Sequence, residues 1–426
     1  MSGSVRLALA LGVFLAGATG GVGHAAPGTL DSSFGSGGTV ATNMARDTPD
    51  LINEGISDVA IQQDGKIVAV GWARRKASPG GEGGIVFAIA RFTRRGTLDR
   101  TFGGDGTRLT GFRTRHAYAG AVAIQADGKI VVAGWAGGFF AVARYTSSGK
   151  RDRSFGRNGR RLTDLTTGGD FASDVALQPN GKILLAGRAG GSGGRFALVR
   201  YLASGRRDRS FGVGGKVMTD FGPRDDPAFG MTLQADGRIV LVGAVAYLAS
   251  GQWGLARYER DGSLDMTFSG DGKAGIDITG DSDWANEVVA QADGTILVGG
   301  AASFGFTDVA LARLDTAGTL DPTFGDGGLV VRDLGGDFDE ARDIAVQPDG
   351  KIVVVGERFS KFVVARFEQD GAPDLPFGGG DGKASTAIGR GSSSATALTI
   401  QRDARIVVAG EARNVSRFGL ARFLAE

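Results

Sequence analysis

The sequence predicts an all-β fold, a seven-bladed β-propeller of four-stranded blades, and three observations predict it. One segment recurs seven times at spacings of 53 to 63 residues. Each copy carries the same three motifs in the same order. Glycine makes up 74 of the 426 residues, as expected for a chain with many tight turns. A fixed period of this size indicates a repeat architecture, and four short strands per period are typical of a propeller blade.

Residues 1–25 are predicted to be a signal peptide. Arg6 precedes an apolar run of ten residues, 7–16, and small residues lead to a cleavage site after Ala25. The run is too short to cross a bilayer, and no later stretch is apolar enough. We therefore expect a secreted or otherwise extracytoplasmic protein with no membrane span in the mature chain. The absence of cysteine excludes disulfides and thiolate catalysis.

The mature chain, 26–426, is predicted to be one domain of seven repeats. Its first motif is an apolar run, then Gln-x-Asp-Gly-Lys, then Ile-Val-Val-Ala-Gly. An Asp-Gly pair between two apolar runs predicts a hairpin, because glycine tolerates positive φ. Ala404 stands at the glycine position of the last copy. That hairpin is expected to be the most strained or to adopt another turn.

Four apolar runs per repeat predict the four strands of a blade. In the third repeat they cover 174–177, 183–186, 196–201 and 216–220. They are short, rich in Val, Ile, Leu and Phe, and bounded by glycine. The mature chain starts with a fourth strand, 38–43, and ends with a third strand, 418–423. We therefore expect the N-terminal strand to complete the C-terminal blade and close the ring.

The second motif is typified by Phe140 to Tyr145, and the third is Gly-x-Leu-Asp-x-x-Phe-Gly. Together with the first, they resemble the delta-60 repeat, a bacterial β-propeller repeat of unassigned biochemical function. The resemblance covers about 30–423 and implies an exported propeller with no catalytic residues to carry over. The motif acids are expected to cap their own turn or to pair with a strand arginine, while the phenylalanine fills the gap between blades. These acids are Asp31, Asp99, Asp152, Asp208, Asp265, Asp321 and Asp374.

Acids at one aligned position form the predicted metal site. This position begins the first strand of each blade, which should line the central channel. It holds Asp58, Asp174, Glu287 and Asp343, whereas the other blades have Ala121, Gly230 and Ala397. A ring of carboxylates at a channel mouth would suit Ca²⁺, which prefers oxygen ligands, or a cationic or sugar ligand. Turn-forming, solvated acids are the alternative interpretation.

Five aromatic residues in the loops of one face are the predicted ligand-binding residues. They are Trp72, Trp135, Tyr247, Trp284 and Phe306. Aromatic rings on a concave face can stack against a sugar, and closing the end of a blade is the alternative role.

The function that these patterns favour is a secreted ligand-binding or scaffold module, acting as a monomer on an extracellular glycan or protein. One alternative is a Ca²⁺-assisted lyase or hydrolase acting on a saccharide or lactone with the channel acids. Another is a passive cell-surface structural protein. The balance of 48 basic and 46 acidic residues argues against nucleic acid as the partner. Only His116 remains as a histidine after cleavage, and no catalytic set is recognised.

Overall fold

The structure is a computed structural model of the whole chain. It describes residues 25–44, 51–76, 83–191, 193–222, 225–245, 251–303, 305–336, 339–358, 360–389, 391–412 and 417–426. Within these ranges the regular elements include 28 strands and the 3-10 helix η2 (Phe377–Gly379). A helix capable of crossing a membrane is not found in the described ranges.

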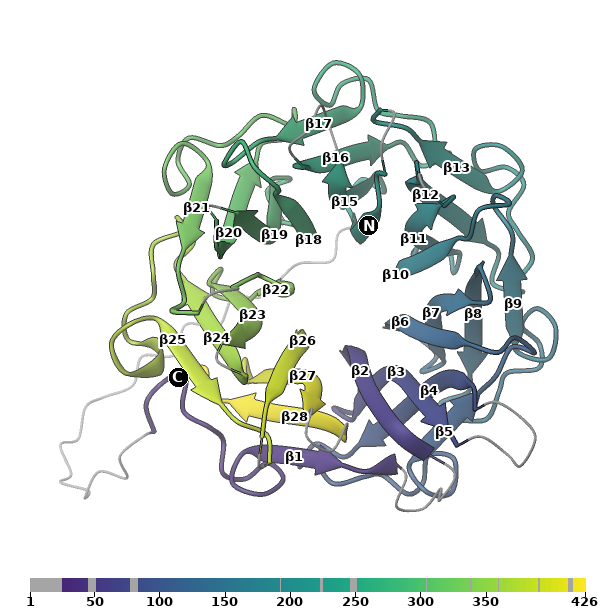
Figure 1. Cartoon of the computed structure of the whole chain (residues 1–426), viewed down its shortest axis with the longest axis horizontal. Coiled ribbons are helices and arrows are strands. Elements are labelled where there is room, and N and C mark those ends of the chain that lie inside the picture. Colours follow the sequence, from purple (N-terminus) through teal and green to yellow (C-terminus); the bar gives the residue numbers. More distant parts are fainter. Residues whose placement is uncertain are drawn as a thin grey trace, which may run out of the picture.

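Seven four-stranded antiparallel sheets surround a central axis, one for each repeat (Figure 1). Blade 1 contains β2 (Leu51–Ile61), β3 (Ile67–Arg75), β4 (Ile85–Phe92) and β5 (Thr107–Thr110). Blade 2 contains β6 (Ala117–Ile124), β7 (Ile130–Ala136), β8 (Phe139–Tyr145) and β9 (Arg160–Thr163). Blade 3 contains β10 (Phe171–Leu177), β11 (Ile183–Ala189), β12 (Arg195–Tyr201) and β13 (Lys216–Thr219).

The remaining blades follow the same order from the axis outward. Blade 4 contains β14 (Ala228–Leu233), β15 (Ile239–Val245), β16 (Gln252–Tyr258) and β17 (Lys273–Ile276). Blade 5 contains β18 (Trp284–Ala290), β19 (Ile296–Ser303), β20 (Thr307–Leu314) and β21 (Leu329–Arg332). Blade 6 contains β22 (Asp343–Val346), β23 (Ile352–Arg358), β24 (Lys361–Phe367) and β25 (Lys383–Thr386). Blade 7 contains β26 (Ser393–Ile400), β27 (Ile406–Ala412), β28 (Arg417–Phe423) and β1 (Thr39–Thr42).

The predicted ring closure is confirmed. β1 pairs antiparallel with β28, with Thr39 opposite Ala421 and Thr42 opposite Phe418. In Figure 1 the purple N-terminal strand lies beside the yellow C-terminal strands. The predicted strands of the third repeat are also found, and three of them extend by up to three residues at one end. The first strand of each blade lies nearest the axis, so its side chains are the ones that reach the channel (Figure 1).

The hydrophobic core lies between neighbouring blades. One cluster joins blade 7 to blade 1, and another joins blade 1 to blade 2. The strands β4 and β8 illustrate why the core lies there, because nearly every side chain of both strands is buried. A strand that is apolar on both faces needs a covering layer on each side, and the two adjacent blades supply it.

The second and third motifs form an Arg–Asp–Phe unit in every blade. The guanidinium Nε lies 2.5–2.9 Å from the carboxylate, and the guanidinium stacks 4.3–4.8 Å from the centre of the phenylalanine ring. The arginine also donates to a backbone carbonyl of the next blade, as from Arg144 to Ala203 (2.6 Å). The predicted pairing of these acids with strand arginines is confirmed, and each unit links two blades.

Residues of the first motif also contact the Arg–Asp–Phe unit. In five blades the basic residue after the hairpin turn binds the motif acid of its own blade, as between Lys182 and Asp208 (2.8 Å). In blades 1, 6 and 7 the glutamine before the turn accepts from the arginine, as Gln347 does from Arg366 (3.3 Å). Ala404 adopts φ +61° and keeps the hydrogen bond from its N–H to Gln401. The last hairpin therefore has the ordinary turn and carries the predicted strain.

Candidate functional site

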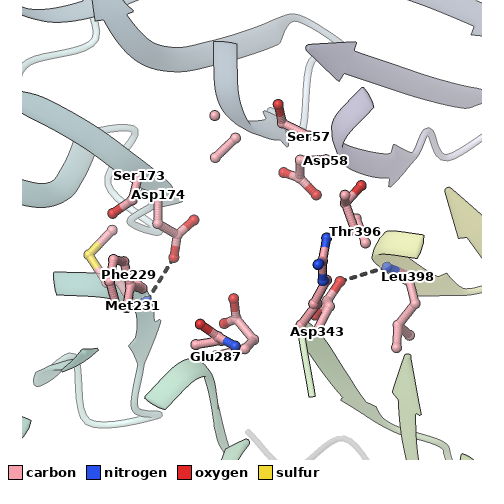
Figure 2. A pocket seen from close by; sticks show the side chains of 15 residues that line it. Ser57, Asp58, Ser173, Asp174, Phe229, Met231, Glu287, Asp343, Thr396 and Leu398 are labelled. Carbon is pink, nitrogen blue, oxygen red and sulfur yellow. Dashed lines mark hydrogen bonds between the residues drawn. The ribbon is translucent and has the colours of Figure 1, made fainter. Parts of the chain in front are cut away.

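The aligned acids converge on the central channel. Asp58, Asp174, Glu287 and Asp343 line one cavity of about 390 Å³ and face one another across it (Figure 2). They come from the innermost strands of blades 1, 3, 5 and 6. The sequence-predicted ring of carboxylates is therefore present as a geometric feature of the channel wall.

A β-bulge sets the direction of these side chains. In six of the seven innermost strands the register shifts immediately before the aligned position, as between Ala172 and Asp174. A bulge turns a side chain locally out of the regular alternation. The bulged residue itself reaches the next blade: Ser173 donates to Ala228 (2.8 Å), and Asn286 donates to Ala341 (3.0 Å).

Three of the four acids act as links between blades. Each accepts a backbone N–H from the following blade: Val122 to Asp58 (2.7 Å), Met231 to Asp174 (2.8 Å) and Leu398 to Asp343 (2.6 Å). In all three cases the donor follows the small residue at the aligned position of the next blade. This contact explains why, at the aligned position, each of these three acids is followed by a small residue in the next blade.

Glu287 differs from the other three acids. Its Oε1 accepts the N–H of its own neighbour Val288 (3.0 Å). The corresponding N–H of the next blade, on Ile344, is bonded to Asp343. Within the described ranges no hydrogen-bond donor to Oε2 of Glu287 is found, and the residue lines the channel cavity (Figure 2). Glu287 is the channel acid whose carboxylate remains available to a ligand.

Burial raises the pKa of all four channel acids. The pKa of Asp174 rises to about 6 and that of Asp343 to about 7. The pKa values of Asp58 and Glu287 rise well above their ordinary range, and repulsion from the other channel acids adds to the burial. The channel therefore holds carboxylates that take up protons far more readily than exposed acids do.

The predicted metal site is not gathered around one point. In the described part of the chain, one group of three acids places its oxygens within 4.8 Å of one another, and it consists of Asp308, Asp333 and Asp339. The channel acids are spread around the wall instead (Figure 2). Calcium takes six to eight oxygens at 2.3–2.6 Å, so a single ion would require rearranged side chains or bridging water. Calcium in the channel stays a prediction.

A row of aromatic side chains crosses blades 1 to 3. Its ring centres are separated by 6.1 Å from Trp72 to Tyr118, 5.5 Å from Tyr118 to Trp135 and 5.0 Å from Trp135 to Phe171. The last two rings are parallel within 3°, and Phe171 is 46% exposed. Gly55 makes room for the first ring, since a Cβ there would lie 2.8 Å from Nε1 of Trp72. We call these four residues the aromatic row.

The other predicted aromatic residues lie outside this row. Trp284, in blade 5, donates through Nε1 to Glu340 (3.2 Å). Phe306 is 63% exposed in the turn between β19 and β20. Tyr247 lies outside the described residues. The structure thus brings Trp72 and Trp135 together and places Trp284 and Phe306 elsewhere.

Sequence reasoning missed Tyr118 and Phe171. Both stand three positions before the aligned channel position, where the other described blades have Gly55, Pro227, Trp284, Glu340 and Ser394. Tyr118 is the register partner of Trp135, and Phe171 is that of Arg188. Comparing this second aligned position across the repeats would have revealed an aromatic sector.

Comparison with known proteins places the repeats in a family. The model described as "Domain of unknown function (DUF5122) beta-propeller" matches residues 62–102, 125–155, 178–211, 234–268, 291–324, 347–377 and 401–426. The chain belongs to the DUF5122 β-propeller family. Among curated proteins none matches this sequence.

Solved structures share the propeller architecture at low sequence identity. A streptogramin B lyase is 11% identical with a TM-score of 0.53, covering 90% of this chain and 97% of its own. Virginiamycin B lyase from Staphylococcus aureus is 12% identical with a TM-score of 0.51, covering 90% and 98%. Sqt1 from Chaetomium thermophilum is 12% identical with a TM-score of 0.50, covering 91% and 100%. At these identities the likeness concerns the fold alone.

Proposed function

We propose that this DUF5122 propeller is an exported sugar-binding module that holds a glycan against the aromatic row. The observation that carries the proposal is the continuous run of Trp72, Tyr118, Trp135 and Phe171 across three blades. Flat aromatic surfaces bind the C–H faces of sugar rings, and Phe171, which is 46% exposed and stacked on Trp135, offers such a surface at the end of the row.

A polar pair stands at the end of the row. Arg188, the register partner of Phe171, lies 2.8 Å from Asp225, and both side chains are partly exposed, at 26% and 43%. A guanidinium and a carboxylate can donate to and accept from sugar hydroxyls that lie beside a stacked ring. Aromatic stacking next to charged hydrogen-bonding groups therefore fits a saccharide.

The channel acids favour binding over catalysis. Asp58, Asp174 and Asp343 have their carboxylates engaged by backbone N–H groups of the next blade, which is an architectural role. An acid–base pair would need a second carboxylate free beside Glu287. The predicted leader peptide, residues 1–25, supports export and hence an extracellular glycan.

The test is binding of a panel of soluble oligosaccharides to the mature chain by calorimetry. Phe171→Ala removes an exposed ring of the row, and Trp135→Ala removes its centre. We expect each variant to weaken binding at least tenfold, about 1.4 kcal/mol. Phe306→Ala, an exposed ring outside the row, is the matched control and should bind as the wild type does.

Three results would overturn the proposal: no oligosaccharide bound at millimolar concentration, unchanged affinity of both row variants, or equal weakening by Phe306→Ala. Hydrolysis or elimination of a bound saccharide that disappears in Glu287→Gln would support the enzyme alternative instead.

A further inference from the structure

A second cluster of acids lies away from the channel, where blade 5 passes to blade 6. Asp308 belongs to β20, Asp333 follows β21, and Asp339 lies four residues before β22. One carboxylate oxygen of each lies within 4.8 Å of one oxygen of each of the others. Asp339 is buried, Asp308 is half-buried and Asp333 is exposed, so the cluster opens to solvent on one side.

Asp339 presents an unpartnered oxygen inside the protein. The residue is 0% exposed, and its Oδ2 accepts the N–H groups of Leu334 (2.7 Å) and Gly336 (3.2 Å). Its Oδ1 is buried and has no hydrogen-bond partner. A buried carboxylate oxygen without a donor is costly unless a cation or a proton satisfies it.

The corresponding acids of two other blades show what is missing. Oδ1 of Asp283 accepts from the Thr279 hydroxyl (2.8 Å) and from the N–H of Ser303 (3.0 Å). Oδ1 of Asp170 accepts from the Thr166 hydroxyl (2.8 Å) and from the N–H of Gly190 (3.1 Å). In both blades the threonine stands four positions before the acid. Gly335 occupies that position before Asp339, so the hydroxyl donor is absent.

Blade 5 has an acid at a position where blade 3 has a cation. In blade 3, Arg195 lies 3.1 Å from Asp220. The strand registers, Phe196 with Thr219 and Val309 with Arg332, align Arg195 with Asp308 and Asp220 with Asp333. The position that neutralises the acid in blade 3 therefore adds a negative charge in blade 5.

No side chain compensates for this charge. Among the described residues, no lysine or arginine lies within salt-bridge distance of Asp308, Asp333 or Asp339. Lys383, on β25, donates to the carbonyl of Leu334 (3.1 Å) instead. Burial, followed by repulsion from Asp333, raises the pKa of Asp308, and burial also raises that of Asp339.

We propose that Asp308, Asp333 and Asp339 bind a calcium ion. Three carboxylate oxygens match the ligand chemistry of this hard cation, and water on the open side would complete its shell. The site is separate from the aromatic row and does not depend on it. Its half-exposed position predicts an affinity of the order of 10⁻⁴–10⁻³ M, the range of extracellular calcium modules.

The experiment compares thermal unfolding of the full mature chain in chelator and in CaCl₂, together with calorimetric titration of Ca²⁺. A tenfold excess of Ca²⁺ over its dissociation constant should raise the folded-to-unfolded ratio roughly elevenfold and the midpoint by roughly 2 °C. Asp308→Arg recreates the arrangement of Arg195 and Asp220. This variant should lose the response to calcium and be more stable than the wild type in chelator.

Two control variants separate the possible sites. Glu287→Gln, in the channel, should keep the full response to calcium. Arg195→Asp would place a third acid beside Asp220 and beside Asp226, which precedes the first strand of blade 4. Asp226 has no unpartnered buried oxygen, so this variant should add little affinity. The proposal is wrong if the wild type shows no response at 10 mM CaCl₂. It is equally wrong if Asp308→Arg responds as the wild type does, or if Glu287→Gln alone abolishes the response.

Discussion

Two sets of carboxylates in the propeller have pKa values shifted in opposite directions. The seven acids of the Arg–Asp–Phe units have lowered pKa values, whereas the four acids of the channel have raised ones. Burial raises the pKa in both places. Around Asp152, the hydrogen bonds from Ser154 and the charge of Arg144 outweigh it. In the channel the neighbouring charges are other acids.

The difference teaches how repetition separates architecture from candidate function. An acid that occurs in every blade is paired with an arginine of the same repeat, so its charge is neutralised in each blade. An acid that occurs in some blades depends on what the next blade offers: an N–H for Asp58, and no donor for Oε2 of Glu287. Departures from the repeat are therefore where ligands are to be sought.

Breaking one Arg–Asp–Phe unit should have the largest effect. Arg144→Met leaves Asp152 buried without its cation and removes the bond to Ala203. Removing one partner of a buried ion pair typically costs about 3–5 kcal/mol. We expect a loss of that size in the free energy of unfolding, measured by urea denaturation at pH 7.

The exposed ion pair of blade 3 provides the control. Arg195 and Asp220 are about half exposed, so Arg195→Met should cost less than about 1 kcal/mol. Equal losses in the two variants would contradict the assignment of the repeated unit as the link between blades. The double variant Arg144→Met, Asp152→Leu should recover much of the loss, because no buried charge is left unpaired.

The channel ring should lower stability as the pH rises. A carboxylate with a raised folded pKa keeps its proton longer in the folded state, so stability is lost between its unfolded pKa and the folded value, about 6 for Asp174 and about 7 for Asp343. The acids of the Arg–Asp–Phe units have lowered pKa values, so their contribution is lost in strong acid. We therefore expect maximal stability at mildly acidic pH, near 5.

Glu287→Gln sharpens this comparison. The variant removes one charge from the channel without removing a bond to another blade. At pH 8 it should be more stable than the wild type by at least about 1.4 kcal/mol, the equivalent of one pKa unit, and the gain should nearly vanish at pH 5. Glu426→Gln changes the net charge equally at an exposed position and should show no such gain. A gain at pH 8 that is equal in both variants would assign the effect to net charge alone.

The fold could be predicted because its signals are local and repeated seven times. The closed ring follows from three features of the sequence: the Asp-Gly turns, the strands that are apolar on both faces, and the fourth-strand segment 38–43, which precedes the first complete repeat. The pairing of the motif acid with a strand arginine also follows from the repeat. Ala404 was recognised as strained, because among the seven hairpin turns of the first motif it alone lacks the glycine that positive φ favours.

The candidate sites were only partly predictable, because they depend on contacts between blades. The channel acids were recognised by alignment, but their bonds to the next blade depend on the bulge that aims them. Trp135 was named, whereas Tyr118 needs the strand register to be placed beside it. Asp308 remained unnoticed because its partner acid Asp339 belongs to the following repeat.

The smallest expected effect concerns the one incomplete Arg–Asp–Phe unit. Asp374 is 1% exposed and its Oδ1 has no partner. In blade 1, Oδ1 of Asp99 accepts both the N–H (3.1 Å) and the hydroxyl (2.7 Å) of Thr101, and Pro376 stands at that position in blade 6. Pro376 has φ −59° and ψ −24°, which threonine adopts without strain. Pro376→Thr should therefore stabilise the protein by about 1 kcal/mol in urea denaturation, the usual worth of a hydrogen bond. Pro376→Ala supplies only the N–H and should gain less, and equal stability of the two variants would show that the hydroxyl contributes nothing to this unit.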